Sequence, residues 1–268
     1  MSRPTPIRIA INGAAGRMGQ RLTALASADD QLQLVAAIEH AAHPRLKADA
    51  GEVAGVGTLG VAIAEKLAGP VDVTIDFSVP AATRTILAMC LEEKIPLVIA
   101  TTGLGAELEE QIREAARQIP LLWAPSMSLA VNLAMKLSQT AAGALAEHPS
   151  GADVEIIERH HRFKEDSPSG TALKFGQLIA EAMGQSHERH GRSGRPGSRP
   201  HDEIGYHAVR TGDNPGEHTI IFGLLGETLE ISVRATNRDC YAHGALAAAK
   251  FLARQKPGLY SMNDVLGL

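Results

Sequence analysis

Near the N-terminus, three regularly spaced glycines separate an expected strand from an expected helix. The short β-branched run at residues 7–11 predicts the strand, and Gly13, Gly16 and Gly19 follow it at once. Apolar residues at helical spacing come next. Glycine allows the backbone to approach a pyrophosphate closely, and a helix N-terminus attracts its negative charge. This order predicts a dinucleotide-binding turn, with an ordinary tight turn as the alternative.

An acidic residue stands about 20 positions beyond this turn, at the end of the next expected strand. Residues 32–39 predict that strand, so the segment forms one βαβ unit. Glu39 can accept a hydrogen bond from a ribose 2′-hydroxyl and favours NAD, whereas Arg17 and His40 could approach a 2′-phosphate. We therefore expect NADH, or both NADH and NADPH, as the cofactor.

The first half of the chain continues to alternate strands and helices. Strands are expected at residues 71–77 and 97–100, and alternating βα units predict a doubly wound parallel sheet. Asp76, Ser78 and Thr101 would lie at the carboxyl edge of this sheet, where ligands bind in such folds. Hydroxyls and free backbone groups of these turns predict contacts with the nicotinamide and its ribose, with ordinary turn chemistry as the alternative.

The pattern changes after about residue 130, in a way that predicts a second, α+β domain. The stretch 187–200, rich in Gly, Arg, Ser and Pro, is expected to be a loop, and residues 242–252 a final helix. The other elements expected there are a strand, a helix and the two strands of an antiparallel hairpin, at residues 154–158, 171–183, 218–223 and 228–233.

Composition narrows the classes of function. A chain of 268 residues suggests about two domains, and 44% hydrophobic with 21% charged residues is typical of globular proteins. A net charge of -4 gives no general attraction for nucleic acid or an anionic membrane. The chain lacks a signal-peptide pattern and any run of about 18 apolar residues, so we expect a cytoplasmic protein without membrane contact. Cys90 and Cys240 are too far apart for a redox or zinc motif.

Four arginines are concentrated in the expected loop at residues 187–200. A nucleic-acid patch is one interpretation, but no aromatic residues are interleaved to stack on bases. A solvated mobile loop explains the composition equally well. The arginines are Arg189, Arg192, Arg195 and Arg199.

The segment 158–171 concentrates titratable side chains more than any other. If the strand continues, His160, Arg162 and Lys164 share one face, because side chains alternate along a strand, and His161 points away unless the backbone bends. Such a face suits a site that holds carboxylates and delivers a proton. The alternative is a solvated basic edge strand. Adjacent histidines diverge and no ligand spacing completes a set, so we expect no metal.

A helix begins directly after these side chains. Ser169 is placed to cap this helix. Gly170 is small enough to admit a ligand to the free N–H groups at Gly170 and Thr171. A helix N-terminus near His and Lys predicts an anion site. Capping by Ser169 is compatible with that function.

Several segments together resemble the 4-hydroxy-tetrahydrodipicolinate reductase (dihydrodipicolinate reductase) family. The combination of HHRFK with PSGTA is the most specific feature, and the similarity covers nearly the whole chain. The segments that carry it are residues 12–19, 100–103, 158–164, 166–173, 212–219 and 258–266.

The resemblance implies a fold and an activity. The fold is α/β, with a Rossmann-like dinucleotide-binding domain at residues 1–129 and 239–268. The second domain, residues 130–238, is an α+β substrate-binding domain whose mixed or antiparallel open sheet assembles a homotetramer. The activity is reduction of the cyclic hydroxy-dicarboxylate to tetrahydrodipicolinate with NADH or NADPH, releasing water, in lysine and diaminopimelate biosynthesis.

The resemblance also implies roles for individual residues. His160 resembles the catalytic acid and Lys164 a second proton donor, while His161, Gly170 and Thr171 resemble contacts of the substrate carboxylates. A hinge is implied near residues 127–130 and 236–240. The cofactor-contacting positions implied are Gly13, Ala14, Ala15, Gly16, Arg17, Met18, Glu39, Ala100, Thr101, Thr102, Ala124, Pro125, Ser126 and Met127.

Three positions depart from the common family pattern. Ser126 stands where many members have Asn in a cofactor-contacting turn. A shorter hydroxyl must therefore make the cofactor contact that the amide makes in those members. His40 stands where many members have Arg, which weakens an argument for NADPH. Phe163 replaces a frequent third histidine and leaves His160 and Lys164 in place.

Two other functions remain as alternatives. An amino-acid or semialdehyde dehydrogenase shares the two-domain plan, and a regulator could bind NADH without turnover. A short-chain dehydrogenase would need Tyr-x-x-x-Lys, but Tyr206 is followed at that spacing by Arg210 and Tyr241 by Ala245.

Overall fold

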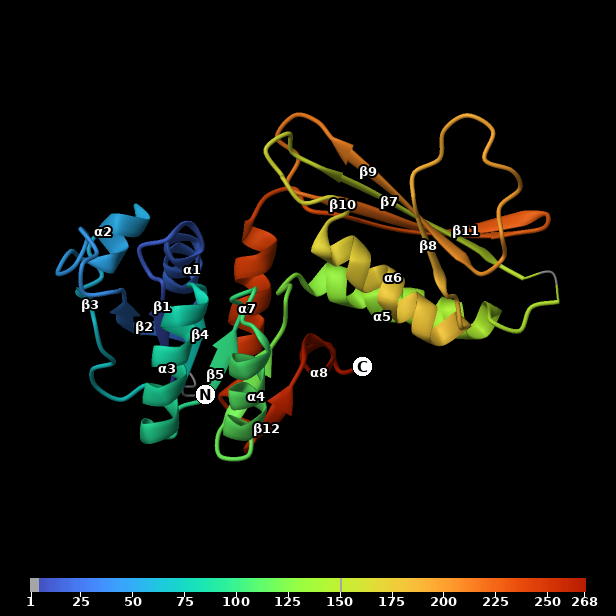
Figure 1. Cartoon of the computed structure of the whole chain (residues 1–268). Helices are drawn as coiled ribbons and strands as arrows, with labels where there is room; N and C mark the ends of the chain where they lie inside the picture. The colour runs from blue at the N-terminus through green and yellow to red at the C-terminus, as the bar shows by residue number, and fades with distance from the viewer. Residues whose placement is uncertain (1–4, 150) are drawn as a thin grey trace. The chain divides into compact units, whose positions relative to one another are not determined.

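The structure is a computed structural model that describes residues 5–149 and 151–268. The chain divides into two compact units. One extends to Leu129 and includes Asp239–Leu268, and the other is Ala130–Arg238. Figure 1 shows a sheet with helices in each.

A seven-stranded parallel sheet forms the centre of the first unit. Its strand order is β12-β6-β5-β4-β1-β2-β3, so the chain reverses direction of winding at β1 and β4. The prediction of a doubly wound parallel sheet is confirmed. The elements are β1 (Ile7–Asn12), α1 (Arg17–Ser27), β2 (Leu32–Ile38), α2 (Ala50–Ala54), β3 (Ile63–Ala64), β4 (Val73–Asp76), α3 (Pro80–Glu93), β5 (Leu97–Ile99), α4 (Ala106–Ala115), β6 (Pro120–Trp123), α7 (Asp239–Leu252), β12 (Gly258–Tyr260) and α8 (Met262–Leu266).

Strand alternation divides the apolar side chains of this sheet between two cores. Ile9 and Ile11 pack with α1 and α7, whereas Ala10 packs on the other face with α3 and α4. The segment after Asp239 adds α7 to the first face and β12 to the edge of the sheet, beside β6. Both faces are covered, which explains why the strands read as continuous apolar runs.

A five-stranded mixed sheet forms the second unit. Its order is β11-β10-β7-β9-β8, with β10 antiparallel to both neighbours and β7, β9 and β8 parallel. Helices α5 and α6 cover one face and bury its apolar residues, among them Val154 and Ile156 (Figure 1). The elements are α5 (Leu129–Leu145), β7 (Asp153–His160), α6 (Gly170–Met183), β8 (His187–His190), β9 (Glu203–Arg210), β10 (Glu217–Leu224) and β11 (Glu227–Arg234).

The expected loop at residues 187–200 is wrong in its first part. His187–His190 form strand β8, which pairs in parallel with β9 and completes the sheet edge. The signal was missed because all four side chains are polar and exposed. Arg192 and Arg199 both donate to Glu155, at 2.7 and 3.0 Å, so these two arginines pair with a carboxylate of the same sheet.

In the part of the chain that the structure describes, no helix is both long and apolar enough to cross a bilayer.

Candidate functional site

The glycine turn after β1 is held by contacts that only glycine permits. Gly13 has φ +79°, and a Cβ there would lie 2.4 Å from the carbonyl oxygen of Phe77. At Gly19, in the first turn of α1, a Cβ would lie 2.1 Å from the Gly13 carbonyl oxygen. These two glycines therefore let α1 begin directly above the strand end. Gly16, the N-cap residue, provides no side-chain cap for the first N–H groups of α1.

A pocket of about 710 Å³ lies beside this turn. Gly13 and Gly16 form part of its wall, and Glu39 and His40 lie at the end of β2. Lys66, which follows β3, joins them although sequence analysis gave it no role. A pocket that joins a glycine turn, a helix start without a side-chain cap and a carboxylate after β2 has the features of a dinucleotide site.

The Glu39 carboxylate also supports the turn itself. Its Oε1 accepts a hydrogen bond from the backbone N–H of Ala15 at 3.1 Å. The acid at the end of β2 is therefore tied to the glycine turn, and the βαβ unit brings the two parts together as the sequence predicted.

The expected hydroxyl contacts at the carboxyl edge are already used within the protein. Asp76 is fully buried and accepts hydrogen bonds from Asn12, Ser78, Thr83 and Thr101, at 2.5 to 2.9 Å. This network joins the ends of β1, β4 and the turn after β5. The Ser78 and Thr101 hydroxyls both donate to Asp76. Contacts of these turns with the nicotinamide and its ribose, through hydroxyls or backbone groups, stay a prediction.

The segment 124–127 after β6 places two side chains in the core. Ala124 and Met127 are 5% and 1% exposed, and both belong to the core beneath α1 and α7. Pro125 is exposed. Ser126 Oγ accepts a hydrogen bond from the Ser128 N–H at 3.4 Å. Any ligand contact by Ala124 or Met127 must therefore use backbone atoms.

In the second unit, strand β7 ends at His160. The backbone then turns, and the Lys164 N–H donates to the His161 carbonyl at 3.1 Å. The shared face of His160, Arg162 and Lys164 was expected only if the strand continued, and the strand ends at the first of them. The bend that a role for His161 requires is present. The turn nevertheless keeps Lys164 near His160, since its charge acts on the imidazole. The Lys164 ammonium donates to both carboxylate oxygens of Asp166, at 2.7 and 2.8 Å.

A buried carboxylate that sequence analysis left without a role connects the parts of this region. Glu158 is 1% exposed and accepts from Nδ1 of His160 at 2.6 Å. It also accepts from both terminal nitrogens of Arg210, at 2.7 and 2.8 Å, and from the Ser169 N–H at 3.0 Å. The alternation of side chains along the strand could have pointed to Glu158. It is separated by two residues from both Ile156 and His160, so all three side chains lie on the helix-covered face of β7. No local pattern points to Arg210, which arrives on β9.

Burial and these contacts shift the pKa values of His160 and Glu158. Burial lowers the pKa of His160, as do the charges of Lys164 and Arg210, while the Glu158 carboxylate opposes the shift without reversing it. Burial alone would raise the pKa of Glu158, but hydrogen bonds from Arg210 and His160 outweigh it and leave the pKa below its ordinary value. The site therefore pairs an ionised carboxylate with a histidine that loses its proton readily.

A second buried histidine completes the cluster. Nε2 of His218 lies 3.1 Å from Oγ of Ser169. The rings of His218 and His160 meet edge-on, with their centroids 5.2 Å apart. Burial lowers its pKa to about 4, so it is neutral at physiological pH. Sequence analysis did not select it, because it lies inside a regular alternating strand.

Helix α6 begins beside this cluster with an open first turn. Ser169 caps it by accepting from the Ala172 N–H at 3.2 Å, as predicted. A Cβ at Gly170 would meet nothing within 4 Å, so the space beside the first residue of α6 is open. Among the described residues, Nδ1 of His161 is buried without a hydrogen-bond partner. These groups form a site for negative charge.

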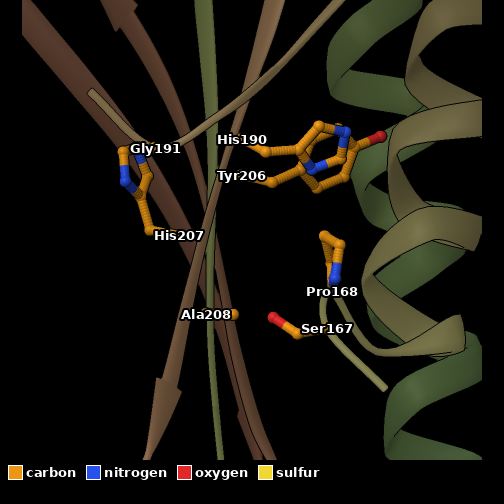
Figure 2. Close-up of a pocket in the computed structure, with 7 residues that line it drawn as sticks. All are labelled: Ser167, Pro168, His190, Gly191, Tyr206, His207 and Ala208. Atoms are coloured by element: carbon orange, nitrogen blue, oxygen red, sulfur yellow. The ribbon is translucent and has the colours of Figure 1, made fainter. Parts of the chain in front are cut away.

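A smaller hollow of about 360 Å³ lies on the β8 and β9 side of the same unit. Figure 2 shows the rings of His190 and Tyr206 stacked, with Ser167 and Pro168 opposite them, at the turn that leads into α6. The ring centroids are 5.3 Å apart at an angle of 13°. No residue predicted from the sequence to bind substrate or cofactor lines this hollow.

Known proteins are similar to this chain over nearly its full length. A curated 4-hydroxy-tetrahydrodipicolinate reductase from Rhodopirellula baltica is 55% identical over 98% of this chain and 97% of its own. One from Alkalilimnicola ehrlichii is 46% identical over 97% and 99%. A dipicolinate-bound dihydrodipicolinate reductase structure from Paenisporosarcina sp. TG-14 has a TM-score of 0.78 at 26% identity, covering 96% and 98%.

More distant structures share only the fold. An amine dehydrogenase from Mycobacterium smegmatis has a TM-score of 0.63 at 14% identity, covering 96% of this chain and 95% of its own. Family models carry the more specific information. The model described as dihydrodipicolinate reductase, N-terminus, matches residues 7–127, and that described as its C-terminus matches residues 130–266. Together with the relatives, they confirm the resemblance found in the HHRFK and PSGTA segments: this chain is a nicotinamide-dependent oxidoreductase that belongs to the dihydrodipicolinate reductase family.

Proposed function

We propose that this chain reduces 4-hydroxy-tetrahydrodipicolinate to tetrahydrodipicolinate with NADH or NADPH, releasing water, in lysine and diaminopimelate biosynthesis. One observation carries the proposal beyond family membership. A histidine, a lysine and an open helix N-terminus converge at one end of the mixed sheet, through His160, Lys164 and Gly170. This set combines proton donors with a site for negative charge.

The substrate is a dicarboxylate, and α6 supplies what its carboxylates need. The relative from Paenisporosarcina is a dipicolinate complex, which is a ligand of the same charge. The space beside Gly170 at the start of α6 is open, and the His161 ring has a buried nitrogen without a partner among the described residues. We assign the carboxylates to His161, Gly170 and Thr171. Hydrogen bonds to ionised groups are shorter and stronger than neutral ones, which favours the dianion.

His160 and Lys164 supply protons. Nδ1 of His160 faces Glu158, so Nε2 is the ring nitrogen left to exchange a proton with the substrate. Gly216 lies against that nitrogen, where a Cβ would come within 2.8 Å of it. The adjacent Lys164 ammonium supplies a second proton and a cation for charge that accumulates on the substrate. When bound, the nicotinamide supplies the hydride.

The cofactor occupies the pocket beside the glycine turn, on the positions matched to the family. Glu39 accepts a ribose hydroxyl and so favours NADH. His40 and Lys66 line the same pocket and supply positive charge for a 2′-phosphate. We therefore assign both cofactors to this enzyme, with Lys66 compensating for the absence of an arginine at position 40.

We further propose that residues 1–129 and 239–268 bind the cofactor, and that residues 130–238 bind substrate and form a homotetramer. The sheet face away from α5 and α6 supports this assembly, because Ile157 and Val209 are 39% and 41% exposed on it. The chain is assigned to the cytoplasm, as expected from its sequence.

A coupled assay tests the activity. Substrate is generated in place from aspartate semialdehyde and pyruvate by the synthase that precedes this step, and oxidation of NADH and NADPH is followed separately. We expect turnover with both cofactors. Cofactor binding without turnover would favour the regulator, and turnover only with amino acids or semialdehydes would favour the related dehydrogenases.

A further inference from the structure

The Glu158 carboxylate is the point at which three segments of the second unit meet: β7, β9 and the connection that leads into α6. Oε2 faces Nδ1 of His160 at 2.6 Å and Nη1 of Arg210 at 2.8 Å. Oε1 accepts from Nη2 of Arg210 at 2.7 Å and from the Ser169 N–H at 3.0 Å. Arg210 also donates to the Asp166 carbonyl at 2.6 Å. A side chain that is 1% exposed and accepts four hydrogen bonds has no remaining capacity for a ligand.

We propose that Glu158 is a positioning residue, which fixes the His160 ring and the N-terminus of α6 in one arrangement. The inference rests on the proposed function, because it assigns a purpose to the orientation of the proton donor and of the substrate-carboxylate site. Arg210 orients Glu158 in turn, through its bidentate contact.

The arrangement determines which nitrogen of His160 can act. A carboxylate beside Nδ1 keeps a proton there, so Nε2 is presented to the substrate. The same carboxylate stabilises the imidazolium form from which a proton is donated. Meanwhile the Ser169 N–H contact holds the start of α6 against β7, which fixes Gly170 and Thr171 relative to His160.

The groups facing His160 come from every neighbouring element. Glu158 lies on β7, Lys164 in the following turn, Arg210 on β9 and His218 on β10. Glu158 is the only one of the four with a negative charge. Its removal therefore leaves two cations and a neutral ring, which disfavour the imidazolium.

Replacement by the neutral amide, Glu158→Gln, tests the proposal. We expect kcat to fall about 10- to 100-fold, the range typical when the outer hydrogen-bond partner of a site histidine is removed. Because the donor must be protonated, kcat declines as pH rises through the pKa of His160. Loss of the carboxylate lowers that pKa, so the decline should move to lower pH by about one unit or more. A role in folding alone would leave its position unchanged.

A matched control lies on the same strand. Glu155 is also a β7 carboxylate that contacts arginine and histidine, but it lies on the opposite sheet face. Glu155→Gln should leave the pH profile of kcat unchanged. An unchanged kcat and pH profile in Glu158→Gln, or the same shift in both variants, would overturn the proposal.

Two further measurements separate this inference from folding and from the proposed function. Glu158→Asp keeps the negative charge but draws it back from Nδ1 of His160 by one methylene, so we expect a lowered kcat and a smaller shift of the pH profile than in Glu158→Gln. Wild-type kcat there would contradict the proposal even if the amide variant does not fold. NMR titration of the His160 ring in the free protein should show a lower pKa in Glu158→Gln, whether or not the assay gives turnover.

Discussion

Glu155 and Glu158 point to opposite faces of strand β7, and each is bound by one histidine and by arginine. Glu155 faces Arg192, Arg199 and His207, whereas Glu158 faces Arg210 and His160. The two carboxylates therefore serve different parts of the second unit. One anchors the segment after β8 on the sheet, and the other lies at the proposed site.

The contribution of Glu155 to stability should depend on pH. Burial alone would raise its pKa, but hydrogen bonds from Arg192, His207 and Arg199 lower it to about 2 from the ordinary 4.5. Folding thus favours the ionised form, and this stabilisation is present above the unfolded pKa and lost as pH falls toward 2. Glu155→Gln should lower the free energy of unfolding by about 1 to 3 kcal/mol near neutral pH.

Urea unfolding at neutral and acidic pH measures this difference, which should shrink between about pH 5 and pH 2. The exposed Glu230 on β11 offers a control, because Glu230→Gln should change stability by less than about 0.5 kcal/mol. A deficit in Glu155→Gln that is constant with pH would contradict the assignment.

Lys164→Ala should lower kcat about 100-fold, the effect typical of losing a positioned proton donor. Lys164 belongs to the second unit and the pocket beside the glycine turn to the first, so affinity for NADH should change little. Steady-state kinetics and a binding titration with NADH check the two statements. Wild-type turnover would remove Lys164 from the mechanism.

Glu39→Ala should lower the affinity for NADH more than the affinity for NADPH, because the ribose 2′-hydroxyl of NADH loses its hydrogen-bond acceptor. Both cofactors should lose some affinity, since the Ala15 N–H also loses the carboxylate that it contacts at 3.1 Å. Dissociation constants for the two cofactors give the comparison. Glu39→Gln, which retains an acceptor, serves as the milder variant, and an equal loss for both cofactors in Glu39→Ala would undercut the ribose contact.

Lys66→Ala should produce the opposite selectivity. Loss of one charge-assisted contact to a 2′-phosphate should raise KM for NADPH about tenfold and leave KM for NADH unchanged. Lys256→Ala, at an exposed lysine of the same unit, provides the control. If KM for NADPH does not change, another group must neutralise the phosphate.

Gly19→Ala should abolish tight binding of both cofactors and destabilise the first unit. The new Cβ would lie 2.1 Å from the Gly13 carbonyl oxygen and 2.6 Å from Ala14, both backbone atoms that cannot yield without moving the turn. Thermal unfolding and cofactor titration measure the two effects. Gly143→Ala in α5 meets nothing within 4 Å and should instead stabilise by about 0.5 to 1 kcal/mol. A Gly19→Ala protein with normal cofactor affinity would show that α1 can move away.

The sequence by itself determined the features that depend on local pattern. The glycine turn, the alternation of strands and helices, the hairpin of β10 and β11 and the cap at Ser169 all follow from periodicity or from single-residue conformational preference. The HHRFK and PSGTA segments identified the family, because residue identity at short spacing carries that information directly.

Tertiary structure alone decided which distant side chains meet. Register places His218 opposite Glu158 and Arg210 opposite His160, on strands that no local pattern aligns. The pairing of strands also decides that β7 ends at His160. It likewise places Lys66 and Glu39 in the wall of one pocket, because β3 pairs with β2. Local sequence sets the alternation of side chains along a strand. The partners and the register of the strand are set by burial of the whole apolar face of the sheet. Partner strands and register in turn determine which charged groups surround His160.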